Sequence, residues 1–109
     1  MEIFLQTKHL IQIDDLSRSD IEEIFALAEY YLQKNKNKVE QKHHLQSFTQ
    51  INVFFENSTR TLASFELAGK KLGGIVQDIR IATSSIQKGE TLIDTALTLN
   101  AMRPDLLIV

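Results

Sequence analysis

Hydrophobic residues recur every three or four positions between residues 21 and 32, a spacing that predicts one amphipathic helix of about four turns. Ser19 and Glu22 have the spacing of a capping box, so we expect the helix to begin beside them. Residues 33–44 contain several lysines and have no apolar period, which predicts a solvated connection. The apolar stripe consists of Ile21, Ile24, Phe25, Ala28, Tyr31 and Leu32.

Three strand candidates follow, separated by two helical patterns. Residues 51–55 and 75–81 are rich in β-branched and aromatic side chains and predict strands, the first of them buried. A helical pattern from Leu62 to Leu72 ends at a glycine pair, and a second runs from residue 90 to residue 102. Pro104 then leads into residues 105–109, which predict a last, buried strand.

The alternation of helices and strands indicates an α/β fold, a three-layer arrangement with a parallel sheet and helices on both faces. A length of 109 residues supports one domain, residues 1–109. The sequence ends on its last hydrophobic strand, whereas chain termini are usually polar and frayed. We therefore expect a fragment whose sheet is incomplete at its C-terminus.

Composition narrows the possible functions. Twelve Lys and Arg face 14 Asp and Glu, a net charge of −2, so nucleic acid is not an expected partner and any anion must be bound locally. The absence of cysteine removes disulfides, thiolate metal sites and thiol nucleophiles, and His43 and His44 lack ligand partners at metal-site spacing. The longest aliphatic run has four residues, against roughly 20 for a membrane helix, and the polar residues among the first 13 do not fit a signal peptide. We expect no membrane contact and a cytoplasmic protein.

Candidate chemistry gathers where the first strand meets the next helix, at Ser58, Thr59, Arg60 and Thr61. In an open α/β sheet, ligands bind beyond the carboxyl ends of the strands, where a helix N-terminus presents unpaired N–H groups. Three hydroxyls and a guanidinium at that point suit a phosphate. The alternative is an ordinary N-cap at Ser58 or Thr59 and a solvated Arg60, although an arginine in a first turn opposes the helix dipole.

A second candidate is the loop that includes Ser84, Lys88 and Gly89. A lone loop lysine is usually only solvated. Here, however, Gly89 allows unusual backbone angles and Ser84 is another anion-binding residue type. Glu90, Thr91 and Asp94 fit the start of the following helix.

These segments resemble the carbamoyltransferase family. Residues 54–61, with Ser64, Phe65 and Glu66, are similar to its Ser-Thr-Arg-Thr region, and residues 84–95 resemble the loop typical of the aspartate carbamoyltransferases. Residues 9–29 are similar to the family's first helix and its approach. The resemblance implies that residues 1–109 are most of the amino-terminal, carbamoyl-phosphate-binding domain. The aspartate-binding domain would lie outside the chain.

The resemblance also implies roles for individual residues. Ser58, Thr59, Arg60 and Thr61 would hold carbamoyl phosphate, with Arg60 neutralising the leaving phosphate and Thr61 near the carbonyl oxygen. Ser84 and Lys88 would reach into the site of a neighbouring subunit of a homotrimer, where Lys88 would contact the phosphate and the carboxylates of aspartate. The product would be N-carbamoyl-L-aspartate, for pyrimidine synthesis, and neither a cofactor nor a metal would be needed. Leu62 departs from the cation that many members carry there.

Two other functions remain open at this stage. An ornithine carbamoyltransferase shares the Ser-Thr-Arg-Thr region, although Lys88 suits a dicarboxylate better than a cationic amine. A non-catalytic phosphate-binding module would retain only the anion site. Because the family's later Arg and His residues and its aspartate-binding domain are missing, we expect the isolated 109-residue chain to be inactive. Whether a regulatory or dihydroorotase partner binds is left open.

Overall fold

The computed structural model describes residues 1–55, 57–81 and 91–109. The chain divides into two compact units, Met1–Glu40 and Gln41–Val109, and each is described by itself.

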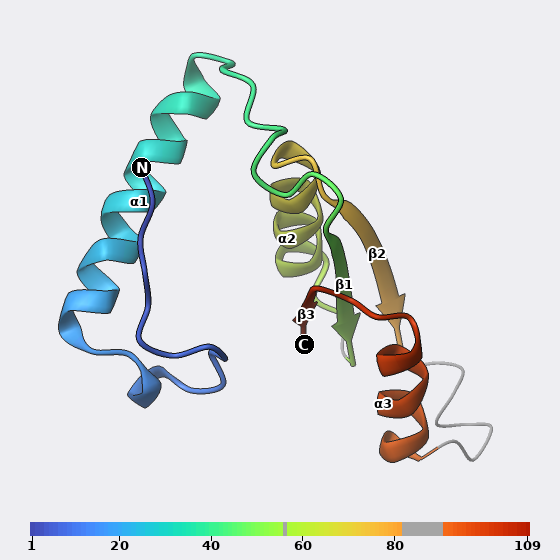
Figure 1. The fold of residues 1–109 in the computed structure, drawn as a ribbon. Coiled ribbons are helices and arrows are strands. Elements are labelled where there is room, and N and C mark those ends of the chain that lie inside the picture. The colour runs from blue at the N-terminus through green and yellow to red at the C-terminus, as the bar shows by residue number, and fades with distance from the viewer. Residues whose placement is uncertain (56, 82–90) are drawn as a thin grey trace. The chain divides into compact units, whose positions relative to one another are not determined.

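The first unit contains a 3-10 turn, η1 (Ile13–Asp15), and the long helix α1 (Arg18–Lys36) (Figure 1). The predicted cap at Ser19 is wrong, because the helix begins earlier with Ser17 as its N-cap. The Ser17 hydroxyl accepts a hydrogen bond from the Asp20 amide, and the Asp20 carboxylate accepts one from the Ser17 amide at 2.9 Å. The Ser17 amide and hydroxyl both donate to this carboxylate, which lowers the pKa of Asp20, a side chain that is only 4% exposed.

Helix α1 also continues beyond the predicted end of its apolar stripe. Lys34 and Lys36 lie in its last turn instead of in a loop, where cations are favourable against the helix dipole. Lys34 also lies over the Tyr30 ring, with Nζ 5.1 Å from the ring centroid. These local interactions stabilise a helix end that hydrophobic periodicity alone does not reveal.

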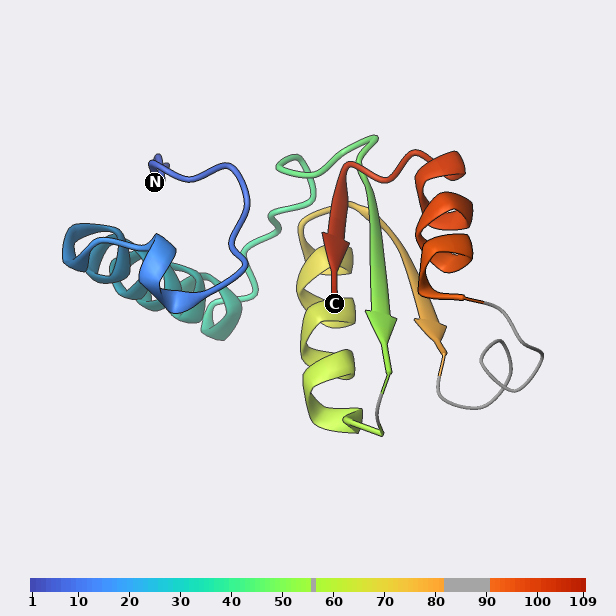
Figure 2. The same cartoon turned by 90° about the horizontal axis from the view of Figure 1, so that it is seen from below.

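The second unit is the predicted α/β fold. Strands β1 (Thr49–Phe54), β2 (Ile75–Arg80) and β3 (Leu106–Ile108) form a parallel sheet in the order β2-β1-β3. Helix α2 (Thr59–Lys71) connects β1 to β2, and helix α3 (Leu92–Ala101) precedes β3. The two helices lie on opposite sides of the sheet, which confirms the expected layers (Figure 2).

Alternation along β1 assigns one face to each helix. Ile51 and Val53 point to one side and form a buried cluster with Ile81 and with Leu99 of α3. Gln50 points to the other side, where its side chain donates a hydrogen bond to the Phe65 carbonyl of α2. One face of β1 is therefore apolar and the other polar, although both are buried.

Two details at the end of the chain differ from expectation. Helix α3 ends at Ala101, one residue before the predicted end, and Arg103 lies beyond it with φ of 52°. Strand β3 was predicted to be buried, but Leu106 and Leu107 are 44% and 45% exposed. The reason is that β3 is an edge strand, which pairs with β1 on one side and with no described strand on the other.

Candidate anion-binding site at the start of helix α2

The candidate site lies at the carboxyl end of β1. The strand ends at Phe54, α2 begins at Thr59, and the helix runs back along the sheet (Figure 1). The side chains of Thr59, Arg60 and Thr61 are exposed, and that of Ser58 is half-buried. The structure thus places these four residues together, at the sheet edge where α/β folds bind ligands.

The start of α2 differs from the starts of the other two described α-helices. Helices α1 and α3 are each closed by a capping box with an acidic residue in the first turn. Ser58 is the N-cap residue of α2, but its side chain makes no capping hydrogen bond and the first turn has no acidic residue. The first N–H groups of a helix have no intrahelical acceptor, so those of α2 point towards the space where an anion would bind.

The hydroxyl groups at this helix start are already organised. Ser58 Oγ donates a hydrogen bond to Thr61 Oγ1 at 3.0 Å, which leaves the Thr61 hydroxyl hydrogen available for another acceptor. Ser64 Oγ donates to the Arg60 carbonyl at 2.8 Å one turn later. The interpretation of Ser58 as an ordinary capping residue is therefore weakened, since its hydroxyl contacts Thr61 and caps no backbone N–H.

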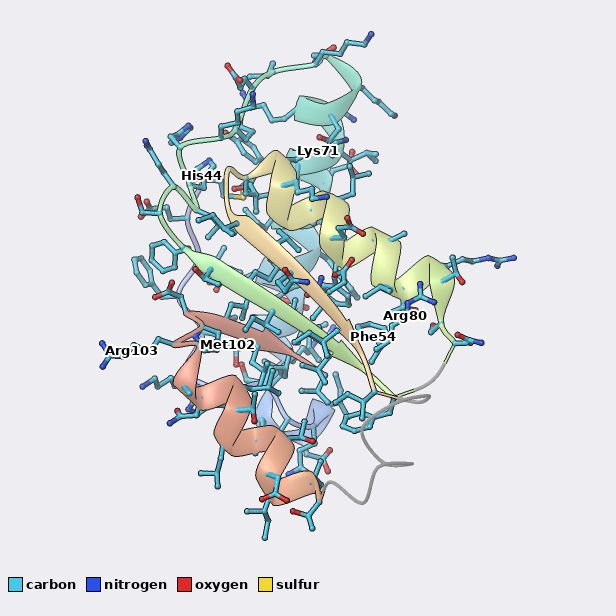
Figure 3. All side chains as sticks on the ribbon, turned by 90° about the vertical axis from the view of Figure 1, so that its right-hand side faces the viewer. His44, Phe54, Lys71, Arg80, Met102 and Arg103 are labelled. Atoms are coloured by element: carbon cyan, nitrogen blue, oxygen red, sulfur yellow. The ribbon has the colours of Figure 1, made fainter. Side chains whose placement is uncertain are left out.

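Leu62 fixes this first turn to the molecule. Its side chain is only 4% exposed, which gives Leu62 a packing role. Phe54, at the end of β1, is 8% exposed and lies opposite Arg80 of β2 in the register of the sheet (Figure 3). The exposed polar residues of the site are therefore flanked in the sequence by two buried residues.

The second candidate segment lies in a part of the chain that the structure does not describe. It contains Ser84, Lys88 and Glu90. Thr91 is the N-cap of α3 and forms a capping box with Asp94, as expected for residues with a structural role.

A buried polar network under α2 is the feature that sequence analysis missed. Asn52 is fully buried and Gln50 is 3% exposed, both on the α2 face of β1. Gln50 Nε2 donates to Asn52 Oδ1 at 3.0 Å, and Asn52 Nδ2 donates to Asp78 Oδ1 of β2 at 2.8 Å. The available signal was polar residues alternating with Ile51 and Val53, which suggests polar contacts on a buried face.

The network continues into charged groups of α2. The negative charge of Glu66 acts on Asp78, and Glu66 Oε1 lies 2.6 Å from Lys70 Nζ. Burial is the main cause that raises the pKa of Asp78. The hydrogen bond from Asn52 opposes this rise, and the negative charge of Glu66 adds to it. The hydrogen bond from Lys70 lowers the pKa of Glu66, and the same pairing raises the pKa of Lys70.

Neither a metal site nor a membrane-spanning helix occurs among the described residues. Within residues 1–55, 57–81 and 91–109, no three His, Cys, Asp or Glu side chains are grouped so that they could hold a metal ion. Among the helices in those ranges, none has the length and hydropathy needed to span a bilayer.

Comparison with protein families shows to which family the chain belongs. Residues 8–109 match the model of the aspartate/ornithine carbamoyltransferase family for its carbamoyl-P binding domain. The chain belongs to this family. Its Ser-Thr-Arg-Thr segment, residues 58–61, lies within the part of the chain that matches this domain model.

Curated carbamoyltransferases agree with the match. The chain is 58% identical over 102 residues to the aspartate carbamoyltransferase catalytic subunit of Ruegeria pomeroyi, an alignment that covers 94% of this chain and 33% of that protein. It is 55% identical over 104 residues to the subunit of the same name from Paracoccus denitrificans, covering 95% and 33%. The chain thus spans about a third of the length of these relatives.

Solved carbamoyltransferase structures share the fold. Trypanosoma cruzi aspartate transcarbamoylase, in complex with carbamoyl phosphate and aspartate, superposes with a TM-score of 0.81 at 38% identity, covering 94% of this chain and 32% of that one. The catalytic subunit of M. jannaschii aspartate transcarbamoylase gives a TM-score of 0.79 at 37% identity, covering 93% and 33%.

Proposed function

We propose that residues 1–109 form most of the carbamoyl-phosphate-binding domain of an aspartate carbamoyltransferase, and that the aspartate-binding domain lies outside this chain. The enzyme would transfer the carbamoyl group of carbamoyl phosphate to L-aspartate, giving N-carbamoyl-L-aspartate and phosphate for pyrimidine synthesis. The observation that carries the proposal is the uncapped start of α2, which presents Ser58, Thr59, Arg60 and Thr61 at the carboxyl edge of the sheet. The relatives named aspartate carbamoyltransferase support the choice of substrate.

Side chains supply most of the proposed phosphate binding. A hydrogen bond to a charged group contributes about 1.5–3 kcal/mol, whereas the helix dipole contributes about 0.3–1 kcal/mol. Arg60 offers a planar fork for two phosphate oxygens, and the hydroxyls of Ser58 and Thr59 add single donors. Their combined contribution exceeds that of the dipole.

Charge develops at two places during the proposed reaction. The aspartate amino nitrogen attacks the carbamoyl carbon, the carbonyl oxygen becomes negative, and the amine proton passes to an oxygen of the phosphate group. The tetrahedral intermediate then collapses by breaking the bond from carbon to the phosphate oxygen. The free hydroxyl hydrogen of Thr61 suits the carbonyl oxygen and Arg60 suits the departing phosphate, so fixed donors stabilise both charges.

A neighbouring subunit completes the proposed site. On the family resemblance, Ser84 and Lys88 reach across to the site of the next chain, and Lys88 binds both the phosphate and the carboxylates of aspartate. This arrangement requires an oligomer, which we propose is a homotrimer. We also propose that the enzyme is cytoplasmic, a compartment in which disulfides are rare; residues 1–109 contain no cysteine.

The deciding experiment assays the full-length protein with carbamoyl phosphate and either aspartate or ornithine as acceptor. We expect N-carbamoyl-L-aspartate to form and no citrulline. The 109-residue chain is assayed beside it and is expected to produce neither. Carbamoylation of ornithine alone would replace the proposal by an ornithine carbamoyltransferase, and binding of carbamoyl phosphate without turnover by the full-length protein would favour a non-catalytic module.

A further inference from the structure

The side chain of Gln50 enters a gap that Gly69 leaves in the surface of helix α2. Gln50 lies on the α2 face of β1 and is only 3% exposed. A Cβ built on Gly69 would collide with Gln50 Oε1 and would lie 2.9 Å from Gln50 Cδ. The amide of Gln50 therefore occupies the place that a side chain at position 69 would take, and the contact needs a glycine there.

Hydrogen bonds hold the amide in this gap. Gln50 Nε2 donates to the backbone carbonyl of Phe65 at 2.9 Å and to Asn52 Oδ1 at 3.0 Å. In an α-helix the carbonyl of residue 65 also accepts from the amide of residue 69, and its second lone pair is available for Gln50. Asn52 is fixed in turn, because its Nδ2 donates to Asp78 Oδ1 of β2 at 2.8 Å. The Gln50 amide is thus held from the helix side and from the sheet side.

This contact determines the register of α2 on the sheet. The segment Thr59–Lys71 contains a single glycine. A shift of the helix by one residue, which combines a rise of about 1.5 Å with a rotation of about 100°, would replace Gly69 by Ala68 or Lys70 at this place. Either residue has a Cβ that would exclude the Gln50 amide. Because packed interiors deform little, only one register satisfies both the glycine gap and the bond to Phe65.

The fixed point lies close to the proposed carbamoyl-phosphate site. Phe65 follows Thr61 by four residues, which corresponds to about 6 Å along a helix axis. Leu62, the buried residue of the first turn, precedes Gly69 by seven residues and therefore lies on the same face of the helix. The face that Gln50 anchors is thus the face that carries the first turn of α2.

We propose that Gln50 is a positioning residue, which sets the place of α2 on the sheet and thereby aligns Arg60 and Thr61 with carbamoyl phosphate. Without its amide, α2 stays folded, but its first turn takes a range of positions. Carbamoyl phosphate then binds less tightly, and its phosphate and carbonyl oxygens are less well aligned with their donors. This inference rests on the proposed function, because carbamoyl phosphate is the ligand whose alignment changes.

The test uses the substitution Gln50→Leu in the full-length enzyme. Leucine has a similar volume and no N–H, so it removes the bonds to Phe65 and Asn52 while the space stays filled. We expect KM for carbamoyl phosphate to rise roughly tenfold and kcat to fall roughly tenfold, because misplacement of a reacting group by about 1 Å can cost about 10²-fold in rate. KM for aspartate should change far less. An unchanged KM for carbamoyl phosphate overturns the inference.

The matched control comes from the other face of the same strand. Val53 is 1% exposed and packs in the apolar cluster with Leu99 of α3, so Val53→Ala destabilises β1 without touching α2. Unfolding midpoints are measured for both variants, and KM for carbamoyl phosphate should stay at the wild-type value in Val53→Ala. An equal rise of KM in this control would show that any loss of stability has the effect, and would also overturn the inference.

Gly69→Ala tests the same contact from the helix side and serves if Gln50→Leu does not fold. Its Cβ would displace the Gln50 amide, so KM for carbamoyl phosphate should rise in the same way. In a double-mutant cycle with Gln50→Ala the two effects on KM should not multiply, because both substitutions break one contact. Fully multiplied effects would mean that Gly69 acts through Val76, whose Cγ2 lies 2.7 Å from the built Cβ, and would overturn the pairing with Gln50.

Amide hydrogen exchange separates this inference from the proposed function, since it needs no activity. We expect Gln50→Leu to lower the protection of α2 more than that of α3, and Val53→Ala to do the reverse. An inactive full-length protein that shows this pattern would refute the proposed function and retain the role of Gln50 in positioning α2. An active enzyme in which Gln50→Leu changes neither α2 exchange nor KM for carbamoyl phosphate would refute the role of Gln50 alone.

Discussion

At the scale of single residues, the same residue type has different roles according to the elements around it. Ser17 and Thr91 cap their helices, whereas Ser58 stands at an equivalent position and bonds to Thr61 instead. Arg60 follows it in a turn without an acidic residue. An anion would compensate this unfavourable placement of a cation at a helix start.

Replacement of Arg60 by alanine tests its role directly. We expect Arg60→Ala to lower turnover of the full-length enzyme by roughly 10²-fold or more, because charge on the departing phosphate is no longer stabilised. The fold should be intact, since the side chain is exposed. Arg18→Ala removes an exposed arginine from the first turn of α1 and is the matched control. Near-normal turnover of Arg60→Ala would contradict the assigned role.

Gly73 allows the sharp turn between α2 and β2. Its φ of 89° lies in the left-handed region, and a Cβ would collide with the Lys42 carbonyl. We expect Gly73→Ala to lower the free energy of unfolding by at least about 1–2 kcal/mol, the cost of the backbone conformation alone. Urea unfolding measures this change.

The neighbouring glycine provides the comparison for that measurement. A Cβ on Gly74 would lie 3.3 Å from the Gly69 carbonyl oxygen and 3.4 Å from Leu45 Cβ, so only a small adjustment is needed. Gly74→Ala should therefore cost much less than Gly73→Ala. Equal losses at the two positions would show that the backbone angle of Gly73 does not matter.

At the scale of elements, β1 packs in different ways on its two sides. Towards α3 it contributes Ile51 and Val53 to an apolar cluster, and towards α2 it contributes the amides of Gln50 and Asn52. Apolar packing tolerates small displacements, whereas hydrogen bonds require particular partners. The helix that carries the proposed site is the one fixed by hydrogen bonds.

Removal of one buried amide should therefore destabilise the sheet and α2 together. Asn52→Ala removes the donor that Asp78 accepts from and one of the two acceptors of Gln50 Nε2, and we expect a loss of about 2 kcal/mol or more in the free energy of unfolding. Chemical denaturation of the full-length protein measures it. Gln77→Ala, an exposed position on the adjacent strand, should change stability far less. A similar small effect for both would mean that water satisfies the network.

The order of helices and strands could be predicted from the sequence because the spacing of hydrophobic residues indicates which side of an element is buried. The candidate site could be predicted because its four residues are consecutive. The start of α1 was misplaced since Ser17 with Asp20 and Ser19 with Glu22 have the same spacing, and only packing distinguishes them. The bond from Asn52 to Asp78 joins residues 26 apart in sequence, and no local pattern predicts such a pair. The burial of β3 depends on which strands and helices lie beside it, and the hydrophobic pattern of the sequence does not specify these.

At the scale of the whole molecule, the proposed activity belongs to an assembly. The chain spans about a third of the length of its relatives, and the proposed site needs Lys88 from a second copy. Each active site would therefore combine residues of two chains. Complementation between inactive variants can detect such sharing.

Mixing Arg60→Ala chains with Lys88→Ala chains should restore activity. Each mixed trimer would contain a site with both residues intact, so about a third of the sites in mixed trimers should be active. Trimer composition is verified by native mass spectrometry, and each variant alone is the control. Verified mixed trimers without activity would contradict the shared site.

The exposed edge of β3 has a consequence for handling the 109-residue chain. Leu106 and Leu107 present half-exposed apolar side chains on a strand whose outer backbone groups pair with no described strand. Such an edge is a template on which a strand of another molecule can add. In solution the chain should self-associate increasingly with concentration, and Leu107→Lys should suppress this, because a charge on an edge strand opposes intermolecular pairing.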